Sequence, residues 1–580
     1  MLSYRKLAMR VLGRPLHTGG IDSPRPASQR AAAFILTAAM LTTLAAPAFA
    51  DIWRIEDGDI TVKAGETKGT NKVSQGTTID KVDTNTIITG TSDTNTVTID
   101  TSKGNVDVTF DDLNIDASSR NEAAMSVTGS GNTTIKLDGD NHLTGGNGDT
   151  YGGDGIASTG SLTISGGETD SLTAQGGSGE NGGDGITSSG SLTISGGTVT
   201  ATGGNSTGIV GSGGSGIHSG GDVTISGGTV TATGGDSTGS DGSGGYGIYS
   251  SSTTTISGGT VTATGGDSTG SYSSGGYGIY SSGVTISGGS TVTANGGSGK
   301  DGSGDGIFSF DPVAISGGTV TANGGNSGGI FNGSDAIKGD KGVTISGGTV
   351  NANGGSGNSS YGGTGISSIN GSVVISGGTV NAAGGNGSTG GGSSIYGKDI
   401  DLSGSLELTA KAGKGNNSNR PHLSQKGSEL DLDTIKDELG PGAKVTATDA
   451  DGKVIDQVPI PRPVEPEESS SSSGGGSAAP SAPASSLPGL TVTDKDGQRI
   501  SYTSTQSGNT LTVCVGRFTA SFRISLAALR QLRAEGIETI AFQTILCSTT
   551  LSVDELLAMG GEDAEAVLTH RFTDSSLTVG

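Results

Sequence analysis

The chain has 580 residues, of which 110 are glycine and only 4% are aromatic. A layered globular core of ordinary bulk cannot be built along most of this length, so a narrower structure must bury the isoleucine and valine side chains. The formal net charge of −23 repels phosphate backbones and argues against nucleic acid as a partner.

The first 50 residues are typical of a signal peptide. Six Lys and Arg residues precede an apolar run from Ala31 to Leu44, and a small-residue cleavage signal ends at Ala50. The run is shorter than the about 20 apolar residues that a membrane-spanning helix needs. We expect cleavage near Ala50, no transmembrane segment in the mature chain, and a product that is secreted or noncovalently associated with the cell surface. Removing this leader, with six basic residues and one acidic residue, changes the net charge from −23 to −28.

Residues 51–98 are expected to form an N-terminal cap and the first irregular strands, and residues 99–408 a repeated structure. The tetrapeptide Ile-Ser-Gly-Gly occurs eight times between Ile164 and Ile375, at intervals of 29 to 31 residues. Such a constant period indicates stacked supersecondary units. A β-sandwich would use similar short strands, but it has no reason to repeat the same side chains at one interval.

Each repeat contains three short segments of alternating apolar and polar residues, for example 247–250, 254–257 and 260–264. Glycine pairs separate these segments, at bends where a positive φ is cheap only for glycine. Three short strands with one apolar face describe one coil of a parallel β-helix, whose neighbouring coils pair about 4.8 Å apart. We therefore predict an all-β fold, a right-handed parallel β-helix with about 30 residues per coil.

The remaining chain is expected to end the stack and to add a second domain. Residues 409–457 are assigned to a C-terminal cap with a short helix near 433–439, and residues 458–488, rich in Pro, Ser and Gly, to a linker. Residues 489–580 predict a small α+β domain, with Ser525 capping a helix over 526–535. Export permits a disulfide between Cys514 and Cys547, although two unpaired thiols are the alternative.

One part of the chain resembles a known family. The stretch from Val106 to Gly146 is followed by Ile-Ser-Gly-Gly-Thr-Val units and contains Asp107-Val108-Thr109-Phe110-Asp111-Asp112 and Asp138-Gly139-Asp140-Asn141-His142-Leu143-Thr144-Gly145-Gly146. It resembles the bacterial secreted carbohydrate-binding domain-containing proteins, which have a pectin-lyase-like parallel β-helix, over about residues 99–408. The resemblance implies binding of extracellular polysaccharide, including acidic polysaccharide with Ca²⁺. The predicted C-terminal domain lies outside it.

A catalytic constellation is hard to find in the coils. Asp111 and Asp112 are adjacent, but side chains of successive strand residues point to opposite faces and cannot flank one glycosidic bond. Residues 151–400 contain no Arg and only four Lys, whereas a lyase needs a strong base beside a uronate. We expect a protein that is not an enzyme and requires no cofactor.

The repeat register nevertheless predicts a row of outward ring side chains. In the Gly-Ile-x-Ser strand the x position follows an inward Ile, and four consecutive coils place there His218, Tyr249, Tyr280 and Phe308. Tyr246 and Tyr277 lie in the adjoining turns. Such a strip could stack on sugars as a carbohydrate-binding site, or the rings could only stabilise neighbouring coils, at about 0.5–1.5 kcal/mol per pair.

Two further columns follow from the same register. Asp154 and Asp184 on one side, and Asp305 and Asp335 on the other, are predicted neighbours in the stack and could hold Ca²⁺, although solvated turn carboxylates are the commoner outcome. Three Asn residues on successive rungs, Asn295, Asn323 and Asn353, are predicted to form a hydrogen-bonded ladder.

These observations favour a secreted, non-catalytic β-helix protein that binds polysaccharide along an outward face of its coils. The alternative is a surface adhesin or spacer that presents its C-terminal domain to a surface protein. A polysaccharide lyase or hydrolase is the second alternative.

Overall fold

The computed structural model describes residues 51–416, 418–419, 421–435, 438–440, 442–458, 490–493, 499–500, 502–507, 509–515, 520–544, 548–559, 564–570 and 575–579. The predicted signal peptide and nearly all of the predicted linker lie outside the described residues. The chain divides into two compact units, residues 1–465 and 466–580, and each is considered by itself.

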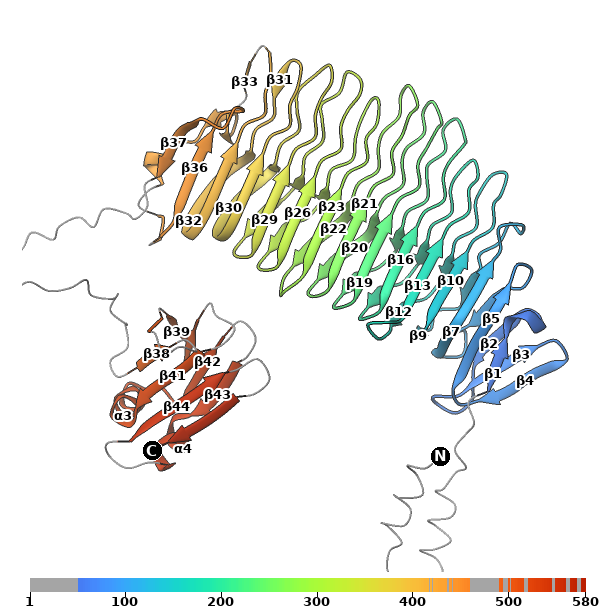
Figure 1. Ribbon diagram of the computed structural model, residues 1–580, viewed down its shortest axis with the longest axis horizontal. Coiled ribbons are helices and arrows are strands. Elements are labelled where there is room, and N and C mark those ends of the chain that lie inside the picture. Colours follow the sequence, from blue (N-terminus) through green and yellow to red (C-terminus); the bar gives the residue numbers. More distant parts are fainter. Residues whose placement is uncertain are drawn as a thin grey trace, which may run out of the picture. The chain divides into compact units, whose positions relative to one another are not determined.

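The first unit is a parallel β-solenoid of about 13 turns with roughly 30 residues each, which confirms the predicted parallel β-helix (Figure 1). Every coil contributes one strand, or one part of a long strand, to each of three parallel sheets. The first sheet contains β2 (Ile60–Ala64), β6 (Val97–Asp100), β8 (Met125–Thr128), β11 (Ile156–Ser158), β14 (Ile186–Ser188), β17 (Ile217–Ser219), β24 (Ile307–Ser309), β27 (Ile337–Gly339) and β34 (Leu423–Gln425), with the beginnings of β20 (Ile248–Ile256), β22 (Ile279–Ile286), β30 (Ile366–Ala383) and β32 (Ile395–Lys411).

The second and third sheets carry the rest of each coil. The second contains β9 (Thr133–Asp138), β12 (Leu162–Ser165), β15 (Leu192–Ile194), β18 (Val223–Ile225), β25 (Val313–Ile315) and β28 (Gly342–Ile345), with the first half of β7 (Val106–Asp116) and later parts of the long strands. The third contains β10 (Asp140–Thr144), β13 (Ser171–Gln175), β16 (Thr198–Thr202), β19 (Thr229–Thr233), β21 (Thr260–Thr264), β23 (Thr291–Asn295), β26 (Thr319–Asn323), β29 (Thr349–Asn353) and β36 (Lys444–Thr448), with the second half of β7 and the ends of β30 and β32. β5 (Thr86–Ser92) pairs with both halves of β7 and so spans the second and third sheets.

Identical residues stack inside the solenoid because the period places them in register. Ile225 lies opposite Ile256, and Val230 opposite Val261, on neighbouring coils. All four side chains are fully buried and belong to one continuous apolar core that runs through the whole stack. Burial of these β-branched side chains stabilises each coil by about 1.5–3 kcal/mol per side chain.

The glycine pairs serve two different purposes. In six of the eight Ile-Ser-Gly-Gly copies the second glycine has a positive φ, such as 77° at Gly259. The glycine pairs at the start of the loops after the third sheet instead let neighbouring loop backbones lie in direct contact. The N–H of Gly266 donates to the carbonyl of Gly245, and the N–H of Gly276 to that of Gly266, each at 2.8 Å. A Cβ on Gly266 would overlap the carbonyl oxygen of Gly235.

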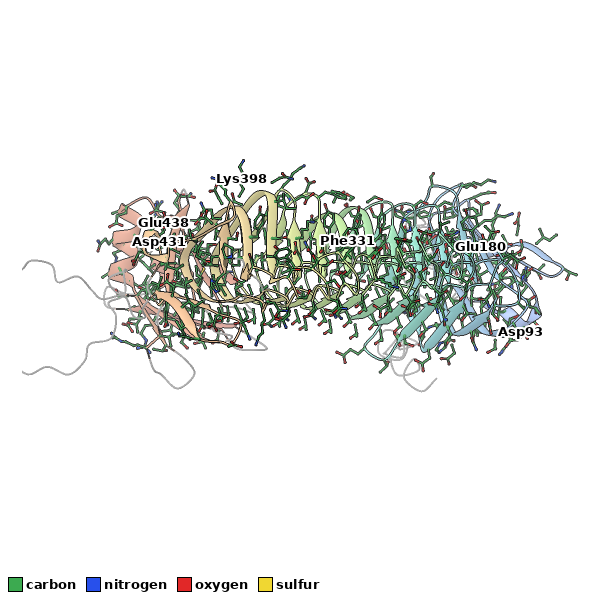
Figure 2. All side chains as sticks on the ribbon, turned by 90° about the horizontal axis from the view of Figure 1, so that it is seen from above. Asp93, Glu180, Phe331, Lys398, Asp431 and Glu438 are labelled. Carbon is green, nitrogen blue, oxygen red and sulfur yellow. The ribbon has the colours of Figure 1, made fainter. Side chains whose placement is uncertain are left out.

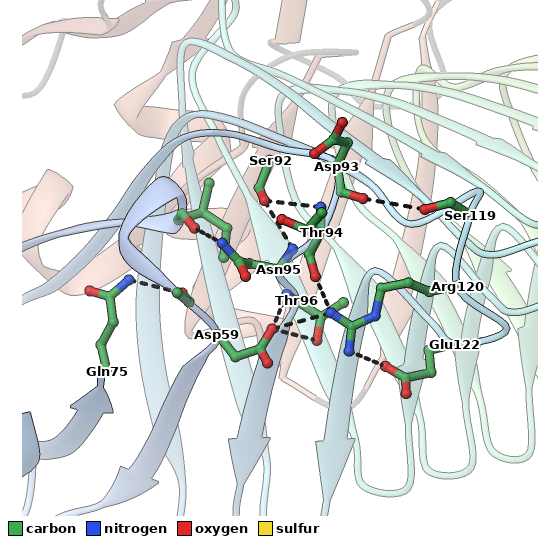
Figure 3. Close-up of polar contacts among 12 residues, drawn as sticks. Asp59, Gln75, Ser92, Asp93, Thr94, Asn95, Thr96, Ser119, Arg120 and Glu122 are labelled. Atoms are coloured by element: carbon green, nitrogen blue, oxygen red, sulfur yellow. Dashed lines mark hydrogen bonds and ion pairs between the residues drawn. The ribbon is translucent and has the colours of Figure 1, made fainter. Parts of the chain in front are cut away.

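Antiparallel strands and polar contacts cover the N-terminal end of the stack. β3 (Asn71–Gln75) pairs antiparallel with β2 and with β4 (Thr78–Asp83), while β1 (Ile52–Arg54) pairs with β5. Arg120 forms ion pairs with Glu122 at 2.9 Å and with Asp59 at 3.5 Å (Figure 3). The contact with Asp59 links the N-terminal cap to the loop after β7. Covering an end in this way blocks edge-to-edge association.

The other end is closed by two short antiparallel additions. β37 (Val454–Val458) pairs with β36, and β35 (Ser428–Glu429) with β34, while β31 (Gly390–Gly391) and β33 (Ser418–Asn419) form a separate small pair. The predicted helix near 433–439 is wrong in extent. A single 3₁₀ turn, η2 (Leu432–Thr434), begins at Asp431, whose side chain accepts the N–H of Asp433, and residues 436–437 lie outside the described residues.

Among its described residues, the second unit contains two four-stranded sheets and two helices. One sheet has the order β38 (Leu490–Thr493), β41 (Ala520–Ser525), β44 (Glu565–His570) and β45 (Ser575–Val579), and the other β39 (Thr503–Ser507), β40 (Thr510–Cys514), β42 (Thr539–Gln543) and β43 (Ser548–Ser552). The predicted helix is present as α3 (Leu526–Ala534), capped by the Ser525 hydroxyl, and α4 (Val553–Met559) follows β43. A core of its own holds this unit together.

Candidate functional site

The predicted column of outward side chains on the first sheet is in register. Tyr249 lies opposite His218 on one neighbouring coil and opposite Tyr280 on the other, and Phe308 follows Tyr280. The column continues from Phe308 to Lys338 and then to Ser367. The repeat period alone was sufficient to predict this alignment, because one residue of each strand pairs with the same residue of the next.

The rings form one packed cluster. We call it the ring cluster, and it consists of His218, Tyr246, Tyr249, Tyr277, Tyr280, Phe308 and Phe310. Tyr249 stacks on Tyr280 with centroids 5.4 Å apart, and Tyr280 stacks on Phe308 at 5.2 Å. Tyr246 and Tyr277 come from the preceding turns and pack across this row, and Tyr246 lies 5.2 Å from Tyr280. Burial raises the pKa of the Tyr277 hydroxyl above its usual range.

The structure corrects the prediction for Phe308. Its side chain is only 7% exposed, because Tyr277, Tyr280 and Phe310 surround it, so it forms the base of the cluster and offers no open ring face. Phe310, which the sequence reading missed, is 45% exposed and meets Tyr280 edge-on with centroids 5.4 Å apart. The sequence feature that could have predicted it is Phe308-Ser309-Phe310, in which Phe310 is a second ring two residues after the column position.

His218 closes the N-terminal side of the ring cluster. Its ring meets Tyr249 edge-on at 4.7 Å, and its Nδ1 lies 2.9 Å from Oδ2 of Asp184. The hydrogen bond to Asp184 raises the pKa of His218. Burial and the nearby Asp184 carboxylate raise the pKa of Asp154 to about 6.

The predicted acid pairs are neighbours in the stack, and each uses one carboxylate oxygen on the neighbouring backbone. Oδ1 of Asp154 accepts the N–H of Asp184, and Oδ1 of Asp305 accepts the N–H of Asp335, both at 2.8 Å. Asp305 is buried, at 6% exposure, and calcium binding by these pairs stays a prediction. Within the described residues, no group of three His, Cys, Asp or Glu side chains is placed to hold a metal.

Tyr396 extends the site beyond the last Ile-Ser-Gly-Gly repeat. It lies opposite Ser367 and opposite Ser424, so it occupies the same outward column as the ring cluster. The sequence analysis did not find it, because the motif that sets the register has decayed to Leu402-Ser403-Gly404-Ser405 in this coil. The signal that could have found Tyr396 is the sequence Ile395-Tyr396-Gly397, which keeps the spacing of the first-sheet strand.

A pocket of about 520 Å³ surrounds Tyr396. Ile369, 53% exposed, contributes an apolar wall, and Asn332 and Asp335 contribute polar groups. Oδ2 of Asp335 accepts a hydrogen bond from the Ser367 hydroxyl at 2.6 Å. Two rungs from Tyr396 towards the ring cluster, the Lys338 ammonium lies 5.4 Å from the centre of the Phe308 ring. The pocket and the ring cluster are therefore adjacent parts of one face.

The predicted disulfide can be described only on the side of Cys514. Its thiol is partly buried, and Sγ lies 3.4 Å from Oε1 of Gln543. Cys547 lies outside the described residues, so the pairing of the two stays a prediction.

Four segments of the solenoid match the family model described as beta helix repeat, at residues 223–248, 255–279, 313–333 and 343–366. Neither the curated proteins nor the solved structures provide a significant match. Among the helices in the described residues, none has the length and hydropathy to cross a bilayer. The repeat match agrees with the parallel coils and covers the ring cluster in part.

Proposed function

We propose that this chain is a non-catalytic polysaccharide-binding protein whose ligand lies along the outward side of the first sheet, from the ring cluster to Tyr396. Beta helix repeats fit a polysaccharide-related protein. The observation that carries the proposal is the pocket around Tyr396, which continues the aromatic column and combines apolar with polar walls.

The walls of this pocket suit the two kinds of surface that a sugar presents. A pyranose ring has an apolar face of C–H groups and a rim of hydroxyls. The Tyr396 ring and Ile369 supply apolar area, while Asp335 and Asn332 supply hydrogen-bond acceptors for hydroxyls. Oδ1 of Asn332 already accepts the Ser360 hydroxyl at 2.7 Å, which fixes its orientation.

The charge of the face favours a neutral polymer. Asp335 contributes a carboxylate to the pocket and Asp340 lies two residues from Lys338, within a chain of net charge −23. These negative charges would repel the carboxylate of a uronic acid, and Lys338 alone would offset that repulsion on this part of the face. We therefore propose a neutral polysaccharide as the ligand, and Ca²⁺ as unnecessary for its binding.

The test is titration of soluble oligosaccharides by calorimetry, using neutral glucan, xylan, mannan and galactan fragments and a galacturonan fragment, each with calcium and with chelator. Tyr396→Ala should weaken binding of the neutral ligand about tenfold or more, because loss of an aromatic anchor at the centre of a site costs about 2 kcal/mol or more and about 1.4 kcal/mol is tenfold in Kd. Ile79→Ala, on β4 of the N-terminal cap and 78% exposed, is the control and should bind normally.

Three outcomes would contradict the proposal. Unchanged affinity of the Tyr396→Ala variant would remove the pocket as the binding site. Binding of galacturonan alone, dependent on calcium, would contradict the neutral ligand. Release of shortened oligosaccharides during the titration, checked by mass spectrometry, would show a lyase or hydrolase.

The alternative, a spacer that presents its C-terminal unit to a surface protein, is supported by the separate core of residues 490–579. It predicts that the full-length chain loses retention on cell surfaces when this unit is deleted, while oligosaccharide affinity stays unchanged.

A further inference from the structure

The loops that return from the third sheet to the first carry a row of exposed apolar side chains at their tips. These loops form the upper edge of the solenoid in Figure 1. Six tip side chains are 52% to 75% exposed, unlike the buried side chains of the coils, and we call them the tip row: Tyr151, Ile209, Val210, Tyr272, Ile330 and Phe331.

The tip row uses every second coil. Tyr151, the pair Ile209 and Val210, Tyr272, and the pair Ile330 and Phe331 are separated by about 60 residues, which is two repeats. The loops between them carry charged tips instead, namely Glu180, Asp241, and Lys300 with Asp301. Figure 2 looks down on this side of the solenoid, where Glu180 and Phe331 are labelled.

Backbone hydrogen bonds hold the tips at the spacing of the coils. The N–H of Asp241 donates to the carbonyl of Ile209 at 2.9 Å, and the N–H of Tyr272 to that of Ser240 at 2.7 Å. The N–H of Asp301 donates to the carbonyl of Ser273 at 3.0 Å. These bonds join the tips of neighbouring coils from Ile209 to Asp301, and apolar tips two coils apart are separated by about 9.6 Å.

We propose that the tip row is a second binding surface, for insoluble neutral polysaccharide whose chains repeat every two sugars. One rung is close to the length of one β-linked pyranose. In a two-fold chain the same sugar face returns at every second residue, so apolar tips on alternate rungs meet equivalent faces along one chain. The polar and charged tips on the intervening rungs face the alternate sugars of the chain, which present their opposite face.

The charge of the tips selects the partner. Asp149, Glu180, Asp241 and Asp301 are offset only by Lys300, so the row repels an anionic bilayer, an acidic glycan and a second copy of this chain. An uncharged polymer surface meets no such repulsion. The proposal depends on the proposed function only for the class of ligand, because the tips and the Tyr396 pocket share no residue.

The experiment is a pull-down of the full-length chain with microcrystalline cellulose and chitin particles, and with insoluble β-1,3-glucan as a polymer without the two-fold repeat. The variant Tyr272→Ser, Ile330→Ser, Phe331→Ser changes only exposed side chains. We expect it to lose about tenfold or more of the retention on the two-fold polymers, since several weak contacts act together. The control Glu180→Gln, Asp241→Asn changes the intervening rungs and should be retained.

The two proposals fail separately. Tyr396→Ala should lose soluble oligosaccharide and keep retention on particles, whereas the triple variant should show the reverse. Equal retention of the triple variant and the wild type, or equal wild-type retention on β-1,3-glucan, would overturn the tip row proposal. Concentration-dependent dimerisation that the triple variant abolishes, measured by sedimentation, would also overturn it and assign the row to a second copy of the chain.

Discussion

Tyr249 and Tyr280 stack face to face on neighbouring coils, with ring centroids 5.4 Å apart and planes inclined by only 10°. Their faces are therefore turned towards each other along the axis of the stack, and a ligand on this side meets their edges and hydroxyls. The inner rings of the cluster chiefly stabilise adjacent coils. Tyr396, which has no such stacking partner among the described rings, is better placed to stack on a sugar.

Tyr280→Ala should destabilise the solenoid. Tyr280 contacts more rings of the cluster than any other member, including Tyr246, Phe308 and Phe310, so its loss removes several aromatic pairs. We expect the free energy of unfolding to fall by about 2–4 kcal/mol, measured by urea denaturation. The exposed Tyr272→Ala should change it by less than about 0.5 kcal/mol, and equal stabilities of the two variants would refute the structural role.

Gly266→Ala should destabilise the stack more than the substitution of an exposed glycine by alanine. Its added methyl group would overlap the carbonyl oxygen of Gly235 on the preceding coil, and such overpacking costs about 1–3 kcal/mol. A Cβ added to Gly289 would have no neighbour within 4 Å, so Gly289→Ala is the matched control. Thermal unfolding followed by circular dichroism should show a lower Tm only for Gly266→Ala.

Stability should fall as the pH rises from about 5 to about 8. Burial, together with Asp335, raises the pKa of Asp305 to about 8, and the pKa of Asp154 is raised to about 6. The folded state therefore binds more protons than the unfolded state over this range. His218 acts in the same direction, because the stabilisation from its bond to Asp184 is lost as the pH rises through its raised pKa.

The measurement is Tm against pH for the wild type and for Asp305→Asn. The Asn side chain can still accept the N–H of Asp335 but cannot ionise, so its curve should be flatter. A wild-type Tm that rises with pH over this window would contradict the assignment of raised pKa values.

The asparagine ladder is present as predicted, and Asn323→Ala should weaken it. Nδ2 of Asn323 donates to Oδ1 of Asn295 at 2.8 Å, and Nδ2 of Asn353 donates to Oδ1 of Asn323 at 2.9 Å. Loss of both bonds should cost about 1–2 kcal/mol, measured by urea denaturation. Thr262→Ala on the same sheet is the control for losing one outward side chain, and it should cost less.

Much of the solenoid could be predicted because its information is local and repeated. The Ile-Ser-Gly-Gly period sets which residues face inwards, and pairing between identical coils then aligns His218, Tyr249 and Tyr280 without any knowledge of distant contacts. Where the motif decays, as in the coil of Tyr396, the register could no longer be counted and Tyr396 was not placed in the column.

The sequence by itself determined the period, the buried Ile and Val columns and the order of side chains along each face, because a parallel stack pairs each residue with its counterpart one repeat away. Only the tertiary structure decided which outward side chains remain open. Phe308 is buried because Tyr277 and Phe310 reach it from a turn and from a strand end, and Gly266 must be glycine because another loop passes against it. Both depend on how neighbouring loops fold back across a face, which a period along the chain does not specify.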